Sequence, residues 1–124
     1  MFIPKWPIQD KVSALSTTRN GGVSQPPFTS FNLAYHVGDK IEHVEKNHQR
    51  LQSYLPGTAC WLNQVHGNKV HHVIRNTDLT HRVQADALYT KQRLQPLAIM
   101  TADCLPILLS SFDGTEKPPL SKIP

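Results

Sequence analysis

Residues 39–57 read DKIEHVEKNHQRLQSYLPG, and this stretch carries the clearest structural pattern in the chain. Asp39 and Glu42, three residues apart, have the spacing of a capping box in which Asp39 is the N-cap. Side chains suited to one buried face recur at helical spacing: Ile41, Val44, His48, Leu51 and Leu55. Pro56-Gly57 then stops the pattern. The sequence therefore predicts one amphipathic helix between Asp39 and Pro56.

Strand-like runs lie on both sides of this predicted helix. Residues 12–18 alternate apolar and polar side chains, which is typical of a half-buried strand. Further runs follow the helix at residues 59–66, 69–75, 85–90, 97–101 and 104–112. Gly67-Asn68 separates the first two of these runs and predicts a tight hairpin. The order predicts an α+β fold with one large sheet, in which the apolar run 104–112 is a buried strand.

Composition and charge exclude several classes of protein. The 124 residues are enough for one domain of ordinary size, and the net charge of +4 is scattered rather than clustered, so we expect no nucleic-acid partner. No apolar run approaches the length that crosses a membrane, and the N-terminus lacks the apolar region of a secretory signal. Two cysteines do not make a disulfide framework, so reduced thiols and a cytoplasmic location are expected.

His66 ends one predicted strand beside the predicted hairpin turn. A sheet holds such a side chain at its rim, where a histidine can serve as a metal ligand or a general base. The alternative is a polar strand end exposed to water, which is the commoner role of a single histidine. His71 and His72 point to opposite faces of the next predicted strand, so they cannot both converge with His66.

Cys104 follows Asp103 between two apolar runs. A free cysteine is most often a small buried hydrophobic residue, but an unpaired carboxylate in an apolar stretch is costly, so the pair indicates a polar site. Thiolate and imidazole are ligands that zinc prefers, which makes His66 and Cys104 a candidate metal pair. Two ligands fall short of the three protein ligands of a catalytic zinc site.

Arg19 lies where the first predicted strand meets the loop that contains Gly21-Gly22. Its guanidinium fork suits an anion, and the glycine backbone allows close approach. The alternative is a solvated arginine in a loop. Cys60 and Trp61, by contrast, are expected in the core of a strand.

Five motifs in a fixed order are more specific than any single residue. They are residues 16–24 (STTRNGGVS), 32–39 (NLAYHVGD), 61–67 (WLNQVHG), 85–87 (ADA) and 100–106 (MTADCLP). The series resembles the bacterial laccase-domain family, whose members were once called polyphenol oxidases and are now viewed as zinc-dependent purine nucleoside phosphorylases. The family includes the peptidoglycan editing factor. The resemblance covers residues 4–116.

The resemblance implies a layered α/β/β/α sandwich of the cytotoxic-necrotizing-factor type and a single zinc ion. The matching ligands are His66, from the Gln-Val-His-Gly motif, and Cys104, from the Ala-Asp-Cys motif. The family's third ligand, a histidine that opens a His-Ala-Gly-Trp-Arg-Gly motif, is absent from this sequence. The older laccase label implies copper, but the chain lacks histidines and cysteines at the spacing that several copper ions need.

The resemblance also implies phosphorolysis of adenosine, inosine and guanosine, together with deamination of adenosine. The partners would be a purine nucleoside and phosphate. Arg19, as the phosphate ligand, and Asp103 are the implied catalytic residues. Asn32, His36 and Gln64 fall in matching motifs and are the implied substrate-binding residues.

Family members are considerably longer than this chain, so the resemblance implies that residues 1–116 correspond to the N-terminal half of a truncated domain. On this interpretation the proline-rich residues 117–124 form an unrelated tail. Three alternatives stay open: a phosphorylase impaired by loss of the third zinc ligand, an inactive truncated or frame-shifted fragment, and a peptidoglycan precursor editing factor. The oligomeric state also stays open. Strands without their partners would be exposed edges, prone to pair with another chain.

Overall fold

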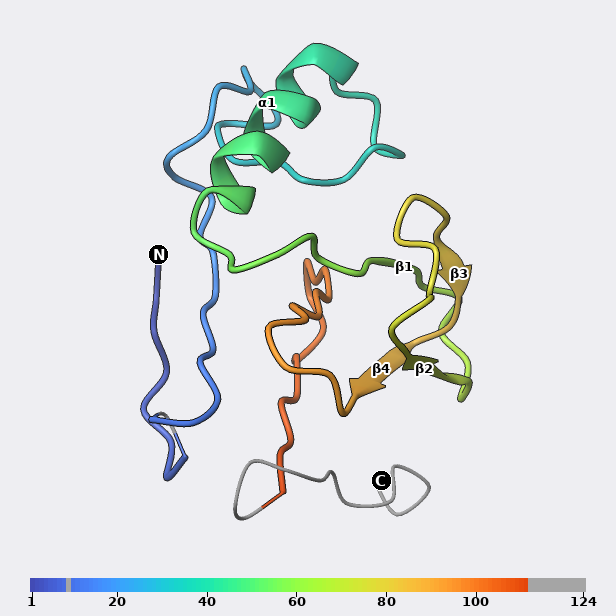
Figure 1. Ribbon diagram of the computed structural model, residues 1–124. Helices are drawn as coiled ribbons and strands as arrows, with labels where there is room; N and C mark the ends of the chain where they lie inside the picture. The colour runs from blue at the N-terminus through green and yellow to red at the C-terminus, as the bar shows by residue number, and fades with distance from the viewer. Residues whose placement is uncertain (9, 112–124) are drawn as a thin grey trace. The chain divides into compact units, whose positions relative to one another are not determined.

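The computed structural model describes residues 1–8 and 10–111 (Figure 1). The chain divides into two compact units, Met1–Tyr54 and Leu55–Pro124. The described part of the first unit contains the helix α1 (Ile41–Gln52). That of the second contains four short strands: β1 (Leu62–Asn63), β2 (Val70–Val73), β3 (Val83–Gln84) and β4 (Ala87–Thr90). Helix and strands are therefore both present, as the predicted α+β class requires.

The predicted helix is confirmed, with boundaries inside the expected ones. Glu42 lies in the first turn of α1 and Arg50 in the last, where each charge interacts favourably with the helix dipole. The helix ends at Gln52, before Pro56 is reached. Ser53 is the C-cap, and its hydroxyl donates to the Arg50 carbonyl in the last turn.

Asp39 is not the N-cap, so the predicted capping box is wrong. Lys40 occupies that position and makes no side-chain capping bond. The Asp39 carboxylate instead accepts hydrogen bonds from the Ser24 hydroxyl at 2.6 Å and from the Asn32 amide at 3.1 Å. The bond from Ser24, with that from Asn32, holds the pKa of Asp39 below its ordinary value of 3.8. Asp39 thus fastens the loop that leads into α1.

The buried face of α1 is centred on a polar residue. Val44 and Leu51 are buried as predicted, and Asn47 between them is completely buried. Ile41, which was predicted for the same face, is exposed. An apolar stripe on α1 therefore surrounds an amide that needs hydrogen-bond partners inside the protein.

The Asn47 carboxamide finds these partners in the loop of residues 22–32. Its oxygen accepts the N–H of Val23 at 2.9 Å, and its nitrogen donates to the Ser24 hydroxyl at 2.9 Å and to the Asn32 carbonyl at 2.8 Å. Gly22 lies so close that a Cβ there would collide with the Asn47 side chain and with the backbone of Ser30. The loop is therefore held against α1 by one side chain.

Residues 12–18 do not form the predicted strand. Ser16 makes an isolated antiparallel bridge with Phe2, through N–H···O bonds of 2.7 Å in both directions. Apolar alternation suits one face of a strand to burial, but a strand also needs a neighbour along its length. Among the described residues, the pairing of this segment is limited to the bridge between Phe2 and Ser16.

The described part of the second unit contains two parallel strand pairs instead of the predicted single large sheet. β1 pairs with β3, in the register Leu62↔Val83, and β2 pairs with β4, in the register Val70↔Ala87. The hairpin predicted across Gly67-Asn68 is therefore wrong, because β1 and β2 each pair with a later strand. The run predicted at 97–101 contributes a single bridge, between Leu97 and Cys60.

These strands enclose the core of the second unit. The buried cluster consists of Cys60, Leu62, Val73, Ala85 and Leu88, with Leu79, Val83 and Leu97 packed against it. Cys60 is buried as predicted, and burial raises the pKa of its thiol above the ordinary value of 9.0. Cys60 is therefore an inert core residue rather than a reactive one.

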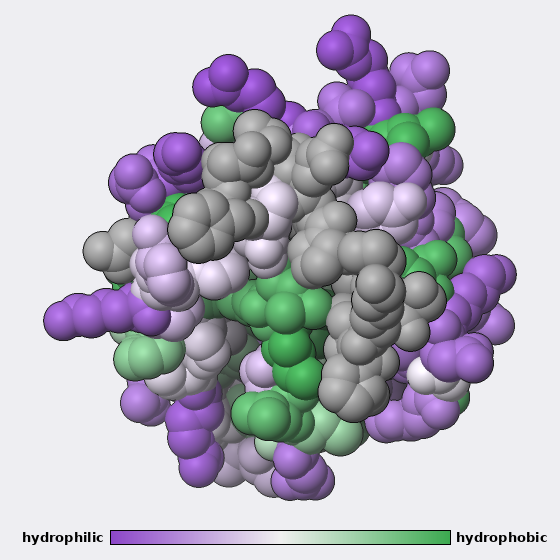
Figure 2. Space-filling model, turned by 90° about the horizontal axis from the view of Figure 1, so that it is seen from below, coloured by the Kyte–Doolittle hydropathy of each residue, from purple (hydrophilic) through white to green (hydrophobic). Residues whose placement is uncertain are grey.

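The predicted buried strand at 104–112 is wrong over the residues that the structure describes. Residues 104–111 are not in a strand, and Phe112 lies outside the described residues. Leu105 is 83% exposed and Ile107 58%. Hydrophobic side chains also reach the surface on the face shown in Figure 2. In the part of the chain that the structure describes, no helix has the length and apolar character to cross a membrane.

Replacing Asn47 tests its role in the first unit. The Asn47→Ala substitution leaves the Val23 N–H and the Asn32 carbonyl without their buried partner. It should lower the free energy of unfolding by about 2–4 kcal/mol, measured by urea denaturation of the full chain. Gln49→Ala, on the exposed side of α1, is the matched control and should change it by less than about 0.5 kcal/mol. Equal effects of the two substitutions would contradict this role.

Candidate functional site

The candidate site residues are divided between the two units. Arg19, Asn32 and His36 belong to the first unit, whereas Gln64, His66, Asp103 and Cys104 belong to the second. Arg19 and Asn32 of the first group line a pocket, and the second group includes a histidine and a cysteine with metal-binding donor atoms.

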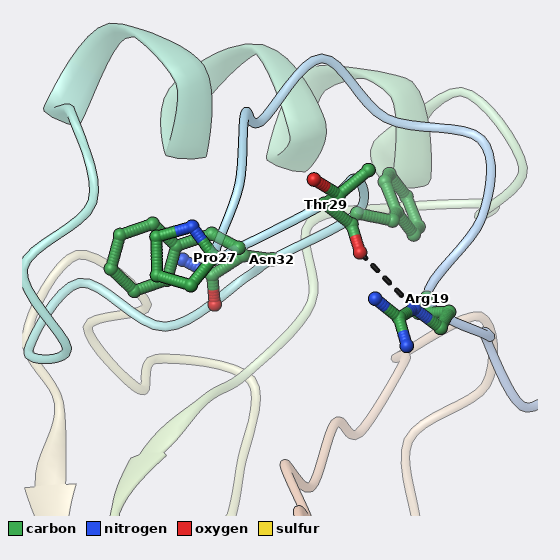
Figure 3. Close-up of a pocket in the computed structure, with 6 residues that line it drawn as sticks. Arg19, Pro27, Thr29 and Asn32 are labelled. Carbon is green, nitrogen blue, oxygen red and sulfur yellow. Dashed lines mark hydrogen bonds between the residues drawn. The ribbon is translucent and has the colours of Figure 1, made fainter.

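An open pocket of about 370 Å³ lies in the first unit. It is lined by Arg19, Pro27, Phe28, Thr29, Phe31 and Asn32. Figure 3 shows Arg19 beside Thr29, with Pro27 and Asn32 on the other side of the view. The pocket combines one cationic side chain with aromatic and proline rings, a lining that suits an organic anion.

The Arg19 side chain is oriented by its own loop. Its Nε donates to the Thr29 carbonyl at 3.2 Å, the bond drawn in Figure 3. The Arg19 carbonyl accepts the N–H groups of Ser30 at 2.7 Å and Phe31 at 2.9 Å. In the described part of the chain its two Nη groups donate to no other residue, so that edge of the guanidinium remains available to an anion.

The other first-unit candidates have different surroundings. The Asn32 nitrogen donates to the Ala34 carbonyl and to Asp39, and its oxygen accepts the Ala34 N–H at 3.0 Å. Asn32 therefore lines the pocket while its amide is occupied within the loop. His36 is exposed and does not line this pocket. Gly22, expected to let an anion approach, packs against protein instead.

In the second unit, one carboxylate holds the turn that carries His66. Oδ1 of Asp86 accepts the N–H groups of Val65 at 2.9 Å and His66 at 2.8 Å, and Oδ2 accepts that of Gly67 at 2.8 Å. The bond from Gly67, with those from His66 and Val65, holds the pKa of the Asp86 carboxyl below its ordinary value of 3.8. The charged carboxylate thus satisfies three successive backbone donors.

His66 has an unusual backbone conformation in this turn. Its φ is 58°, in the left-handed region that few residues other than glycine adopt. Such a conformation costs free energy and persists where the surroundings enforce it, which the Asp86 carboxylate does here. The His66 side chain is exposed, as the alternative interpretation of the sequence expected. An exposed imidazole on a fixed backbone is accessible to a ligand.

Gln64 links two of the sequence motifs. Its Oε1 accepts the N–H of Met100 at 3.2 Å, which joins residues 61–67 to the start of residues 100–106. Asp103 and Cys104, further along the second motif, are both exposed. Both the buried-hydrophobe alternative for Cys104 and the expected junction of two strands around it are therefore wrong.

The described residues do not form a metal site by themselves. They contain no group of three or more His, Cys, Asp or Glu side chains arranged to hold a metal ion. His66 and Cys104 have suitable donor atoms and are accessible, but two donors do not complete a zinc site.

Sequence reasoning missed two residues on which these sites depend. Asp86 enters the sequence motifs only as the centre of Ala-Asp-Ala, although a single carboxylate between two small apolar residues is a signal of internal hydrogen bonds. Asn47 lies three residues after Val44 and four before Leu51, so its position on the apolar face of the helix was a usable signal.

The stability of the turn that Asp86 holds should decrease as the pH falls. The folded-state pKa is lowered, so the stabilisation is complete above the unfolded-state value and is lost as the pH falls through the folded-state value. Amide exchange protection at Val65, His66 and Gly67 should therefore decline in acid, and Asp86→Ala should remove it at neutral pH. The control is Asp103→Asn, which changes an exposed carboxylate outside this turn and should leave the exchange protection of these three amides unchanged. Protection that persists in Asp86→Ala would refute the assignment.

The comparisons with known proteins agree on one family. The family described as multi-copper polyphenol oxidoreductase laccase matches residues 13–116. The chain is 44% identical over 118 residues to a protein of Escherichia coli strain K12 named purine nucleoside phosphorylase YfiH, a match that covers 94% of this chain and 48% of that protein. Purine nucleoside phosphorylase PA4543 of Pseudomonas aeruginosa is 44% identical over 113 residues, which cover 91% of this chain and 45% of the relative.

A solved structure is similar to this chain in both fold and sequence. The crystal structure of Neisseria meningitidis protein NMB0706 superposes with a TM-score of 0.85 at 38% sequence identity, covering 94% of this chain and 47% of that one. The chain spans about half the length of the curated relatives it matches. The resemblance drawn from the five motifs is thereby confirmed. Because the family match extends over residues 13–116, the chain belongs to the multi-copper polyphenol oxidoreductase laccase family.

Proposed function

We propose that residues 1–116 form the N-terminal half of a purine nucleoside phosphorylase domain with a layered α/β/β/α arrangement. The observation that carries this proposal is the 44% identity to the Escherichia coli protein named purine nucleoside phosphorylase. The candidate residues of both units lie within the family match at residues 13–116. Residues 117–124 lie outside the described residues and carry none of the argument.

Phosphorolysis requires a site for phosphate. An oxygen of phosphate forms a bond to the anomeric carbon of the nucleoside while the bond from that carbon to the purine nitrogen breaks. Arg19 is the proposed phosphate ligand, because Thr29 orients its guanidinium while the outer edge stays available. The volume of the pocket beside it is within the range of small-molecule sites.

The remaining candidate residues differ in whether their side chains form hydrogen bonds to other protein groups. Asn32 and Gln64 bond to their own surroundings, which favours a role in shaping a substrate site over direct chemistry. His36 and Asp103 are exposed, and within the described residues no hydrogen bond occupies either side chain. We propose Asp103 as a catalytic residue and His36 as a substrate-binding residue.

The proposed metal is zinc, with His66 and Cys104 as two of its ligands. A bound zinc ion would act as a Lewis acid. Since a catalytic zinc site needs a third protein ligand, this chain alone should bind the metal weakly.

The phosphate proposal predicts a selective effect of Arg19. The Arg19→Gln substitution removes the charge that faces the pocket, so the affinity for inorganic phosphate should fall by about tenfold or more. Chemical-shift titration of the full chain with phosphate measures this affinity. Arg93→Gln changes another exposed arginine, outside the pocket, and should leave the affinity within about twofold. Equal losses in the two variants would indicate non-specific attraction and contradict the assignment.

The metal argument predicts that the purified chain has little activity of its own. Its zinc content, measured by elemental analysis, should be below one per chain, because two donors do not complete the site. The rate of phosphate-dependent hypoxanthine release from inosine should be a small fraction of the rate measured with the Escherichia coli relative. Conversion of adenosine to inosine is measured in the same assay. Stoichiometric zinc together with phosphate-dependent hypoxanthine release would overturn this expectation.

A further inference from the structure

Residues 101–109, called here the 101–109 segment, expose an unusual amount of apolar side chain. Leu105 is 83% exposed, Ile107 58% and Leu108 52%. Isolated exposed apolar residues are common on protein surfaces, but a run of large aliphatic side chains at this exposure usually marks an interaction site. The segment therefore has the side-chain character of an interior element at a surface position.

The backbone of the same segment also has no hydrogen-bond partner among the described residues. The Gln64–Met100 bond ends just before it, and the Ser110–Ser111 bond follows it. Between these points, in the described part of the chain, the structure gives no hydrogen bond from residues 101–109 to any other residue. Exposed aliphatic side chains, together with N–H and C=O groups that lack a partner in the described part of the chain, are the properties of a strand at the edge of a sheet. Pro106, near the start, is tolerated at such an edge.

We propose that the 101–109 segment is a docking strand for the polypeptide that makes up the other half of this family's domain. The match to the Neisseria meningitidis structure covers 94% of this chain but only 47% of that one. The same fold there is therefore accompanied by a comparable length of further polypeptide. Pairing with this polypeptide would give hydrogen-bond partners to the backbone groups that have none among the described residues, and it would cover the exposed aliphatic side chains.

Co-expression tests this proposal without relying on phosphorylase activity. The full 124-residue chain, tagged at its N-terminus, is co-expressed with the part of the Escherichia coli relative that this chain does not match. The two polypeptides should co-purify as a one-to-one complex. Exchange of the backbone amides in residues 101–109 should then slow by about tenfold or more relative to the chain alone.

Matched substitutions locate the contact. The Leu105→Asp variant should weaken the complex by about tenfold or more, because it places a charge where an aliphatic side chain would be buried. Leu94→Asp changes another highly exposed leucine of the second unit, outside the segment, and should leave the complex intact. Equal weakening by both variants would overturn the assignment to this segment.

Two further outcomes would reject the proposed partner. In the first, both polypeptides are present in the cell extract but do not co-purify. The second is a dimer of the chain alone in which residues 101–109 are protected, which would assign the segment to a second copy. If the unmatched half is not recovered, a fusion of that half after residue 116 decides the question. Unprotected amides in residues 101–109 of the fusion would then overturn the proposal.

Discussion

Backbone polar groups need hydrogen-bond partners, and a chain with little regular structure has to supply them from side chains. Asn47 does so in the first unit, where its carboxamide bonds to Val23, Ser24 and Asn32 of one loop. Asp86 does so in the second, where its carboxylate accepts three successive N–H groups. The shape of both loops depends on these two side chains, and so does the placement of the candidate residues that the loops carry.

The same constraint explains why a parallel pairing replaces the predicted hairpin. Gly67-Asn68 is a good turn sequence, but the Asp86 carboxylate occupies the N–H of Gly67 and of the two preceding residues. The Asp86 N–H itself donates to the Lys69 carbonyl at 3.1 Å, beside the pairing of β2 with β4. A local turn preference contributes little against several bonds to a charged group. The strands therefore pair with partners that follow later in the chain.

The candidate site was only partly predictable. Arg19 and Asn32 were chosen from motifs, and the structure places both around one pocket. His66 was expected at a strand end beside a hairpin turn, but β1 ends at Asn63 and His66 lies in the turn that Asp86 holds. Its left-handed backbone depends on a carboxylate twenty residues away, which no local pattern reveals. Cys104 was expected at a junction of strands and lies exposed, because the 101–109 segment has no strand neighbour among the described residues. Strand propensity is a property of one segment, whereas a strand forms only when a second segment pairs with it.

By itself, the sequence determined the helix over residues 41–52, the burial of Cys60 and the family, because these follow from local periodicity, apolar character and the order of motifs. Only the tertiary structure decided which strands pair, which polar side chains hold the loops and which apolar segment stays exposed. Each of these outcomes is a competition between residues far apart in the chain. Hydrogen bonds formed across such distances outweigh the preference of any short stretch.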